Sequence, residues 1–312
     1  RCIGGNRSGE FAIVMSFHVE DSWENRMADA QANAEQIEYW NERGGPQWVQ
    51  LQERLDTQIS PFGLVTLDQA AAQRGESVLD VGCGCGQTSL TLAELVGPQG
   101  SVTGVDISQP MLGRARERQQ EQQIENLTFI NADAQLHQFE SANVDLIFSR
   151  FGVMFFDDAK MAFGNLRTAL RSGGRLCFIC WQELKKNDWV RVPLQAAAQH
   201  VPLPPPPEPG TPGPFAFADP DRVHDILESA SFRDVTLQSY ETDMSLGGAA
   251  GIEGAVEFLL AIGPVASLLR ESDEATRTRV AGAIHKALAP HEDGNSVNLH
   301  SATWIVQAQV NQ

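Results

Sequence analysis

The sequence predicts an α/β fold: a seven-stranded sheet, mostly parallel with an antiparallel last strand, that carries helices on both faces and helical insertions. Two observations predict it. Short apolar runs alternate with stretches of helical periodicity between residues 78 and 181, and such alternation makes the strands parallel because each helix crosses back over the sheet. The chain has 312 residues, 42% of them hydrophobic, so it can bury the core of a large domain.

A glycine-rich turn follows the first predicted strand. Residues 78–81 form an apolar, β-branched run, and Gly82, Gly84 and Gly86 follow at alternate positions. Residues 88–96 then have the apolar spacing of a helix. Glycine lets the backbone touch a ligand and adopt positive φ, and the helix start offers free N–H groups. The sequence therefore predicts a nucleotide-binding loop.

The spacing of the glycines separates two classes of ligand. A dinucleotide loop has the pattern Gly-x-Gly-x-x-Gly, but Gln87 stands where its third glycine would be. Asp80, inside the strand, suits a ligand with a cationic amine instead. The run Val-Leu-Asp-Val-Gly-Cys-Gly-x-Gly from residue 78 resembles the first motif of class I S-adenosylmethionine (SAM) methyltransferases. The resemblance implies cofactor contacts from Asp80, Gly82, Cys83, Gly84, Gly86, Gln87 and Thr88.

A second acidic residue ends the next predicted strand, residues 101–105. Asp106 lies about twenty residues beyond the loop, where a carboxylate can accept both ribose hydroxyls of an adenosine. Both NAD and SAM carry that ribose, so Asp106 alone does not distinguish them. Ile107 is expected to pack on the adenine, and Ser108 to cap a helix whose Met111 faces inward.

Two later motifs continue the resemblance. The strand 127–131 leads into Asp133 and Ala134, which match the adenine-reading motif of the family, and the strand 144–149 ends at Ser149. Family members contact the methionine part of the cofactor there, which implicates Ser149 and Arg150. Residues 78–181 thus resemble the SAM-binding core of ubiquinone/menaquinone-type small-molecule methyltransferases. The resemblance implies a Rossmann-like fold, SAM as cofactor and S-adenosylhomocysteine as product.

The chain is expected to divide into three segments. Residues 1–14 are interpreted as an extension outside the fold, residues 15–74 as a helical cap, and residues 75–312 as the methyltransferase domain. Helices are expected over residues 22–41, 47–59 and 63–73, the second ended by Ser60-Pro61. Trp40 is a candidate cofactor contact from this cap, although simple packing explains it slightly better.

Two insertions are expected above the site. Residues 183–219 contain a proline-rich loop, with half of the sixteen prolines between 202 and 214. Residues 247–295 contain helical runs at 252–270 and 273–288, between a sixth strand at 234–240 and a last strand at 297–310. Both insertions leave strands that end on the cofactor side, so they are predicted to form a lid over a moderately apolar substrate. The second insertion could instead make a homodimer contact.

Charge and cysteine content bear on partners and compartment. The net charge of −17 disfavours a nucleic-acid substrate, and no apolar run reaches the length of a membrane span. Five cysteines, an odd number without a signal peptide, favour reduced thiols in the cytoplasm. Cys83/Cys85 and Cys177/Cys180 are not expected to bind metal, because another strand should separate the two pairs.

The sequence therefore predicts a SAM-dependent methyltransferase that acts on a small molecule. The acceptor atom is not specified. A non-catalytic SAM-binding protein is the first alternative, and a nicotinamide-dependent oxidoreductase, which Gln87 and Asp80 disfavour, is the second. No catalytic residue is assigned. His18 and His200 are the only histidines expected to reach the site as bases.

Overall fold

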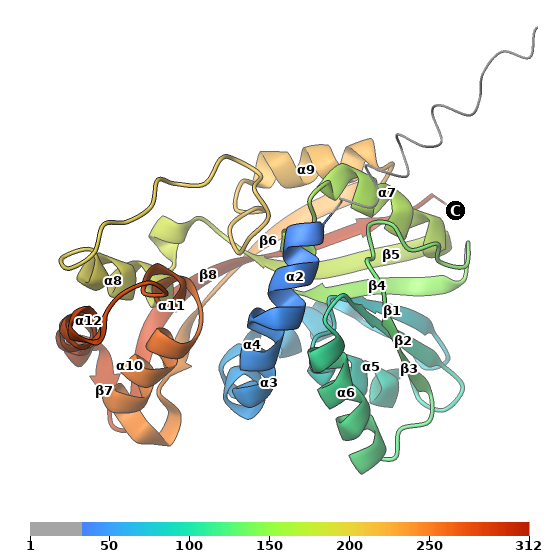
Figure 1. Cartoon of the computed structure of the whole chain (residues 1–312). Coiled ribbons are helices and arrows are strands. Elements are labelled where there is room, and N and C mark those ends of the chain that lie inside the picture. Colours follow the sequence, from blue (N-terminus) through green and yellow to red (C-terminus); the bar gives the residue numbers. More distant parts are fainter. Residues whose placement is uncertain (1–32, 312) are drawn as a thin grey trace, which may run out of the picture.

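The computed structural model describes residues 33–311, so the predicted extension 1–14 and the candidate base His18 lie outside the described residues. One sheet runs through the molecule, with strand order β3-β2-β1-β4-β5-β8-β6 (Figure 1). The strands β1 to β5 are parallel, and β8 runs antiparallel between β5 and β6. The predicted mostly parallel sheet with an antiparallel last strand is confirmed.

The strands are β1 (Ser77–Val81), β2 (Ser101–Asp106), β3 (Leu127–Asn131), β4 (Val144–Arg150), β5 (Leu170–Trp181), β6 (Arg233–Leu246), β7 (Glu292–Asp293) and β8 (Ser296–Gln309). The sequence did not predict β7, a two-residue strand that pairs with β8. The sixth strand is also six residues longer than expected at its carboxyl end, because β6 stays paired with β8 from Arg233 to Leu246. These two strands extend past the parallel part of the sheet (Figure 1).

Helices cover both faces of the sheet. In Figure 1, α7 (Ala159–Ala169) and α9 (Pro220–Ser229) lie on one side, and α4 (Gln52–Ala70), α5 (Gln87–Val96) and α6 (Gln109–Glu121) on the other. The short helices α2 (Ala34–Glu42) and α3 (Gly44–Gln50) precede α4. None of the helices in residues 33–311 combines the length and the apolar character that crossing a bilayer requires.

The predicted break at Pro61 is wrong, because this proline lies inside α4, a single helix of 19 residues. Proline removes the hydrogen bond to the carbonyl four residues earlier, which here belongs to Thr57. Both residues are exposed, so water can satisfy that carbonyl. The opposite face of α4 buries Leu55, Ile59 and Phe62, and this packing stabilises the helix across the proline.

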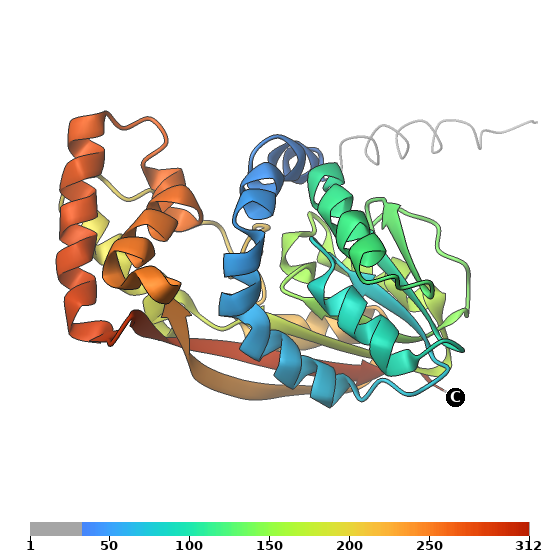
Figure 2. The same ribbon diagram turned by 90° about the horizontal axis from the view of Figure 1, so that it is seen from below.

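The two insertions contain more helix, and shorter helices, than the sequence indicated. The first contains α8 (Asp188–Ala197), and residues 198–219 after it have neither helix nor strand. The second contains α10 (Gly251–Ala261), α11 (Pro264–Leu268) and α12 (Glu274–Leu288). The expected single helix 252–270 is broken at Gly263, whose φ of +86° precedes Pro264. Figure 2 shows α8 and α10 to α12 together at the far end of β6 and β8.

A polar contact joins the second insertion to α4. The Arg54 guanidinium donates a hydrogen bond to the Gly254 carbonyl and lies 4.8 Å from the centroid of the Phe258 ring. Burial lowers the pKa of Arg54, and the neighbouring Glu257 partly offsets this. Cation–π contacts of this kind contribute about 0.5–2 kcal/mol, so Arg54 fastens α10 against α4.

Candidate functional site

A cavity of about 540 Å³ opens at the carboxyl ends of β1, β2 and β4. Helices α2 to α4 form one wall, and α8, α10 and α11 form the wall opposite. Both insertions therefore contribute to the enclosure. Ten of the residues singled out from the sequence line this cavity: Trp40, Gly82, Cys83, Gly84, Asp106, Ile107, Met111, Asp133, Ala134 and Arg150.

The glycine loop is bare because its surroundings leave no room for side chains. Gly82 has φ +66° and Gly84 has φ +55°. A Cβ on Gly82 would lie 2.6 Å from the Cα of Gly152, and a Cβ on Gly84 would lie 2.8 Å from the terminal methyl of Met111. Gly152 is equally tight, since its Cβ would lie 2.6 Å from the Val81 carbonyl oxygen. Backbone packing therefore requires glycine at positions 82 and 152, and positive φ favours it at positions 82 and 84.

Asp106 is held at the end of β2 by backbone donors. Its Oδ2 accepts from the Gly84 N–H at 2.8 Å, and its Oδ1 accepts from the Ser108 N–H at 2.8 Å. Burial raises the pKa of Asp106, while these N–H groups act in the opposite direction. Each carboxylate oxygen keeps a second lone pair. Asp106 could therefore accept two more hydroxyl groups from a ligand in the cavity.

Asp133 is held in the same manner, but by a residue that the sequence did not bring to notice. Its Oδ2 accepts from the Asn33 amide at 2.8 Å and its Oδ1 from the Gln135 N–H at 2.8 Å. The Asn33 side chain also accepts from the Asp157 N–H at 2.8 Å. Asn33 lies 100 residues before Asp133, outside any motif, so no local signal could have revealed the contact.

Five of the predicted cofactor contacts lie behind the cavity wall: Asp80, Gly86, Gln87, Thr88 and Ser149 do not line it. Asp80 is fully buried, and its Oδ2 accepts from the hydroxyls of Thr88 at 2.8 Å and Ser89 at 2.6 Å. Its Oδ1 has no partner among the described residues. Burial raises the pKa of Asp80 to about 6. Direct contact of these five with a ligand stays a prediction.

Ser149 and Gln87 support residues that do reach the cavity. The Ser149 hydroxyl donates to the Val81 carbonyl at 2.7 Å and accepts from the Gly152 N–H at 3.2 Å. It therefore holds the turn after β4 against the start of the glycine loop. The side-chain carbonyl of Gln87 accepts from Arg150. Burial lowers the pKa of Arg150, and the nearby Asp56 and Asp80 carboxylates raise it.

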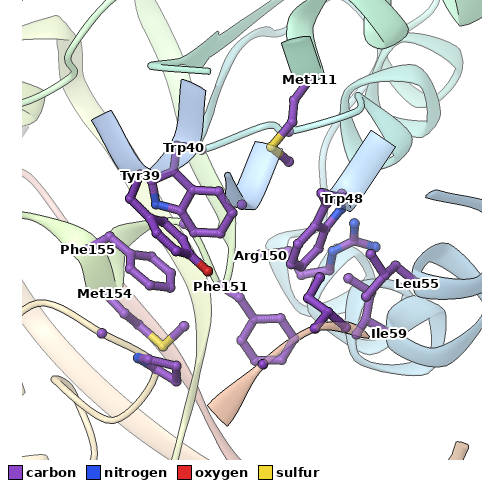
Figure 3. A pocket seen from close by; sticks show the side chains of 18 of the residues that line it. Tyr39, Trp40, Trp48, Leu55, Ile59, Met111, Arg150, Phe151, Met154 and Phe155 are labelled. Atoms are coloured by element: carbon purple, nitrogen blue, oxygen red, sulfur yellow. The ribbon is translucent and has the colours of Figure 1, made fainter. Parts of the chain in front are cut away.

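Arg150 lies in the cavity beside the cap helices. Figure 3 shows its side chain close to those of Trp48, Leu55 and Ile59, with Trp40, Tyr39 and Phe155 on the other side. The neighbouring Asp56 is already paired, because its Oδ2 lies 2.6 Å from the Gln52 amide and 3.0 Å from Arg118. Arg150 has no ion pair within 4.0 Å among the described residues, so its guanidinium could receive a carboxylate.

The remainder of the cavity is apolar and aromatic. Phe151 and Trp181 stack with ring centroids 4.3 Å apart and planes inclined by 7°. The Trp189 ring follows at 4.8 Å from Trp181. Phe151 adopts φ +60°, a backbone conformation that bulky residues rarely adopt and that costs about 1–3 kcal/mol. The turn after β4 is therefore held in a strained form that places this ring in the cavity.

No histidine, lysine or glutamate of the described chain lines the cavity. His200, a candidate base from the sequence, does not line it, because it follows α8 on the outside of the first insertion. The two cysteine pairs are separate, since β4 lies between β1 and β5. In the part of the chain that the structure describes, no three His, Cys, Asp or Glu side chains cluster as metal ligands.

Part of the chain matches a known protein family. Residues 72–201 match the model of a methyltransferase domain. Aklanonic acid methyltransferase DauC from Streptomyces sp. (strain C5) is 35% identical over 127 residues, which cover 40% of this chain and 58% of that protein. A demethylmenaquinone methyltransferase from Listeria welshimeri is 32% identical over 127 residues, covering 41% and 54%. The chain spans little more than half the length of these relatives.

A solved structure extends the likeness in fold beyond that segment. The YcgJ protein from Bacillus subtilis superimposes with a TM-score of 0.53 at 14% identity, over 81% of this chain and 99% of that one. At this identity the likeness concerns the fold alone. Residues 72–201 thus match a methyltransferase domain, and the glycine loop, the acids at the strand ends and the strand order are similar to those of class I, SAM-dependent methyltransferases.

Proposed function

We propose that this chain transfers a methyl group from SAM to a small-molecule acceptor. The observation that carries the proposal is Asp106, whose two oxygens are fixed by Gly84 and Ser108 at the end of β2 and face the cavity. Two hydroxyl groups on one five-membered ring suit such a carboxylate. The similarity to methyltransferases of aklanonic acid and demethylmenaquinone supports a small-molecule acceptor.

The proposal assigns cavity residues to each part of SAM in turn. Asp133 and Ala134 would hold the adenine, with Ile107 and Met111 against its faces, and Asp106 would hold the ribose. Arg150 would bind the α-carboxylate, because a guanidinium binds carboxylates through two parallel hydrogen bonds. The unpartnered Oδ1 of Asp80, behind the loop, supplies negative potential near the ammonium. SAM itself supplies the activated methyl group, so the chain's task is alignment.

The insertions would exclude water from the reacting atoms. The apolar side chains of the second insertion turn inward: Phe258, Leu259, Val265 and Leu269 are all buried. No large apolar side chain of α10 to α12 is among the exposed ones of the described chain. This favours a lid over the alternative of a homodimer contact through that insertion. The four described cysteines are free thiols, which supports a cytoplasmic location.

Two measurements test the function. Calorimetry with SAM, S-adenosylhomocysteine and NAD should give binding of the first two and none of the third. Incubation with methyl-tritiated SAM and a panel of small-molecule acceptors should then move the label into an acceptor. Binding of NAD in preference to SAM would refute the proposal. Tight SAM binding with no labelled product from any acceptor would favour a non-catalytic SAM-binding protein.

A further inference from the structure

One polar residue interrupts the apolar face that α4 turns toward the cavity. Leu55, Gln58, Ile59 and Phe62 recur at helical spacing, and the first three line the cavity. Gln58 is only 6% exposed, and its amide nitrogen has no hydrogen-bond partner among residues 33–311. A buried donor left unpaired costs about 1–3 kcal/mol. A ligand atom in the cavity that accepts this N–H bond would remove that cost.

The surroundings of Gln58 select the shape of that ligand. The stacked rings of Phe151 and Trp181, with Trp189 beside them, line the same cavity as Trp48 and Phe258. Flat apolar rings pack on such surfaces in offset-stacked or edge-to-face geometry. A long flexible polar acceptor would leave these rings in contact with polar atoms. The wall therefore suits a planar ring system.

The protonation chemistry of the cavity restricts the acceptor further. No histidine, lysine or glutamate of the described chain lines it. Asp56 is paired with Arg118 at 3.0 Å, and Asp106 and Asp133 each accept hydrogen bonds at both oxygens. Each of these carboxylates, which line the cavity within residues 33–311, is thus already engaged with a cation or with hydrogen-bond donors. An acceptor that meets only these groups must be deprotonated before it binds.

We propose that Gln58 is the polar anchor for the methyl acceptor, and that the acceptor is a flat, largely apolar ring compound that is already an enolate or acidic phenolate when it binds. The proposal rests on the function proposed above and narrows its substrate class. The Gln58 amide donates to an oxygen of the anion, and the aromatic wall packs against its ring.

The transfer then needs no proton acceptor. The anionic oxygen of the acceptor attacks the methyl carbon, a C–O bond forms, and the C–S bond breaks with its electron pair returning to sulfur. The anion and the sulfonium become a neutral ether and a neutral thioether. Charge is neutralised as the bonds change, which an apolar, water-poor cavity favours because it stabilises separated charges poorly.

Three ring probes of similar size test the substrate class, each titrated in the presence of saturating S-adenosylhomocysteine. They are 4-hydroxycoumarin, an anion at neutral pH, 1-methylnaphthalene, which has no oxygen, and 1-naphthylmethylamine, a cation. We expect 4-hydroxycoumarin to bind at least tenfold tighter than the amine. With labelled SAM it should yield 4-methoxycoumarin. Equal or tighter binding of the amine would overturn the proposed class.

Variants of Gln58 test the anchor. Gln58→Leu should weaken the binding of 4-hydroxycoumarin about tenfold, the effect of one net hydrogen bond. The affinity for 1-methylnaphthalene should stay unchanged. Gln58→Glu should weaken the binding of the anion further and strengthen the binding of 1-naphthylmethylamine. A merely structural residue would not produce this reversal. Gln69→Leu, on the same helix but off the cavity, is the control and should change neither.

The outcomes separate the two proposals. If the wild-type protein binds S-adenosylhomocysteine but Gln58→Leu leaves the affinity for 4-hydroxycoumarin unchanged, Gln58 is not the anchor and the methyltransferase proposal stands. If the wild-type protein fails to bind S-adenosylhomocysteine, the methyltransferase proposal falls and the substrate class falls with it.

Discussion

Replacing Asp106 by alanine should weaken cofactor binding more than any other single change at the strand ends. Its two oxygens are oriented by the Gly84 and Ser108 N–H groups, both at 2.8 Å, and each can accept one ribose hydroxyl. A hydrogen bond to a charged group contributes about 1.5–3 kcal/mol. Losing two therefore removes about 3–6 kcal/mol, which raises the dissociation constant of S-adenosylhomocysteine roughly 10²- to 10⁴-fold.

Isothermal titration calorimetry measures this change directly. A double-mutant cycle that changes both the protein and the ligand isolates the ribose contacts. Asp106→Ala should weaken the binding of adenosine but leave the binding of 2′,3′-dideoxyadenosine, which lacks both hydroxyls, nearly unaffected. Asp145→Asn is the matched control, because this buried carboxylate accepts from the Ser77 N–H at the opposite end of the sheet. It should lower stability without altering affinity. A folded Asp106→Ala protein that binds S-adenosylhomocysteine within threefold of wild type would refute the reasoning.

Three further changes test the loop, the buried acid and the lid. Burial raises the pKa of Asp80 from 3.8 to about 6, so the stability that its neutral form confers is complete below pH 4 and is lost as the pH rises through 6. In urea unfolding without cofactor, the free energy of unfolding of Asp80→Asn, relative to that of wild type, should rise by up to about 3 kcal/mol between pH 4 and pH 7. A difference that does not change with pH would contradict this. Gly152→Ala should lower the free energy of unfolding by about 1–3 kcal/mol through backbone overlap, whereas Gly164→Ala, with open space around it in α7, should raise it by about 0.5–1 kcal/mol. Arg54→Ala should speed hydrogen exchange in α10 about tenfold, with Arg279→Ala on α12 as the control; unchanged exchange would show that Arg54 does not hold the lid.

The strand order and the features at the strand ends that line the cavity could be predicted because both depend on short-range patterns. The glycine loop, Asp106 and Asp133 each follow a strand directly, and parallel strands bring their carboxyl ends to one edge. In the structure all three lie on the cavity wall, as these patterns predict. Local sequence was sufficient wherever a residue's position along a strand determines where its side chain lies.

Both insertions were expected above the site, but most of the individual residues that meet there could not be predicted, because they come from segments far apart in the chain. Gln58 on α4, Phe151 after β4 and Trp189 on α8 meet only in three dimensions. Pro61 indicated a break that tertiary packing overrides. Asn33 reaches Asp133 across 100 residues. No periodicity in the sequence records such contacts, since each depends on how helices of the cap and the insertions pack on a finished sheet.

The position of β8 determines the order in which the sheet can be completed. Within the described chain β6 pairs with β8 alone, and β8 separates it from β5. During synthesis β6 therefore has no neighbour until residues from Val297 onward, which pair first with Leu246, have left the ribosome. The five parallel strands can assemble earlier, from contacts within residues 77–181. The nascent protein should thus acquire its nucleotide crevice first, and enclose the acceptor chamber only when the final strand inserts.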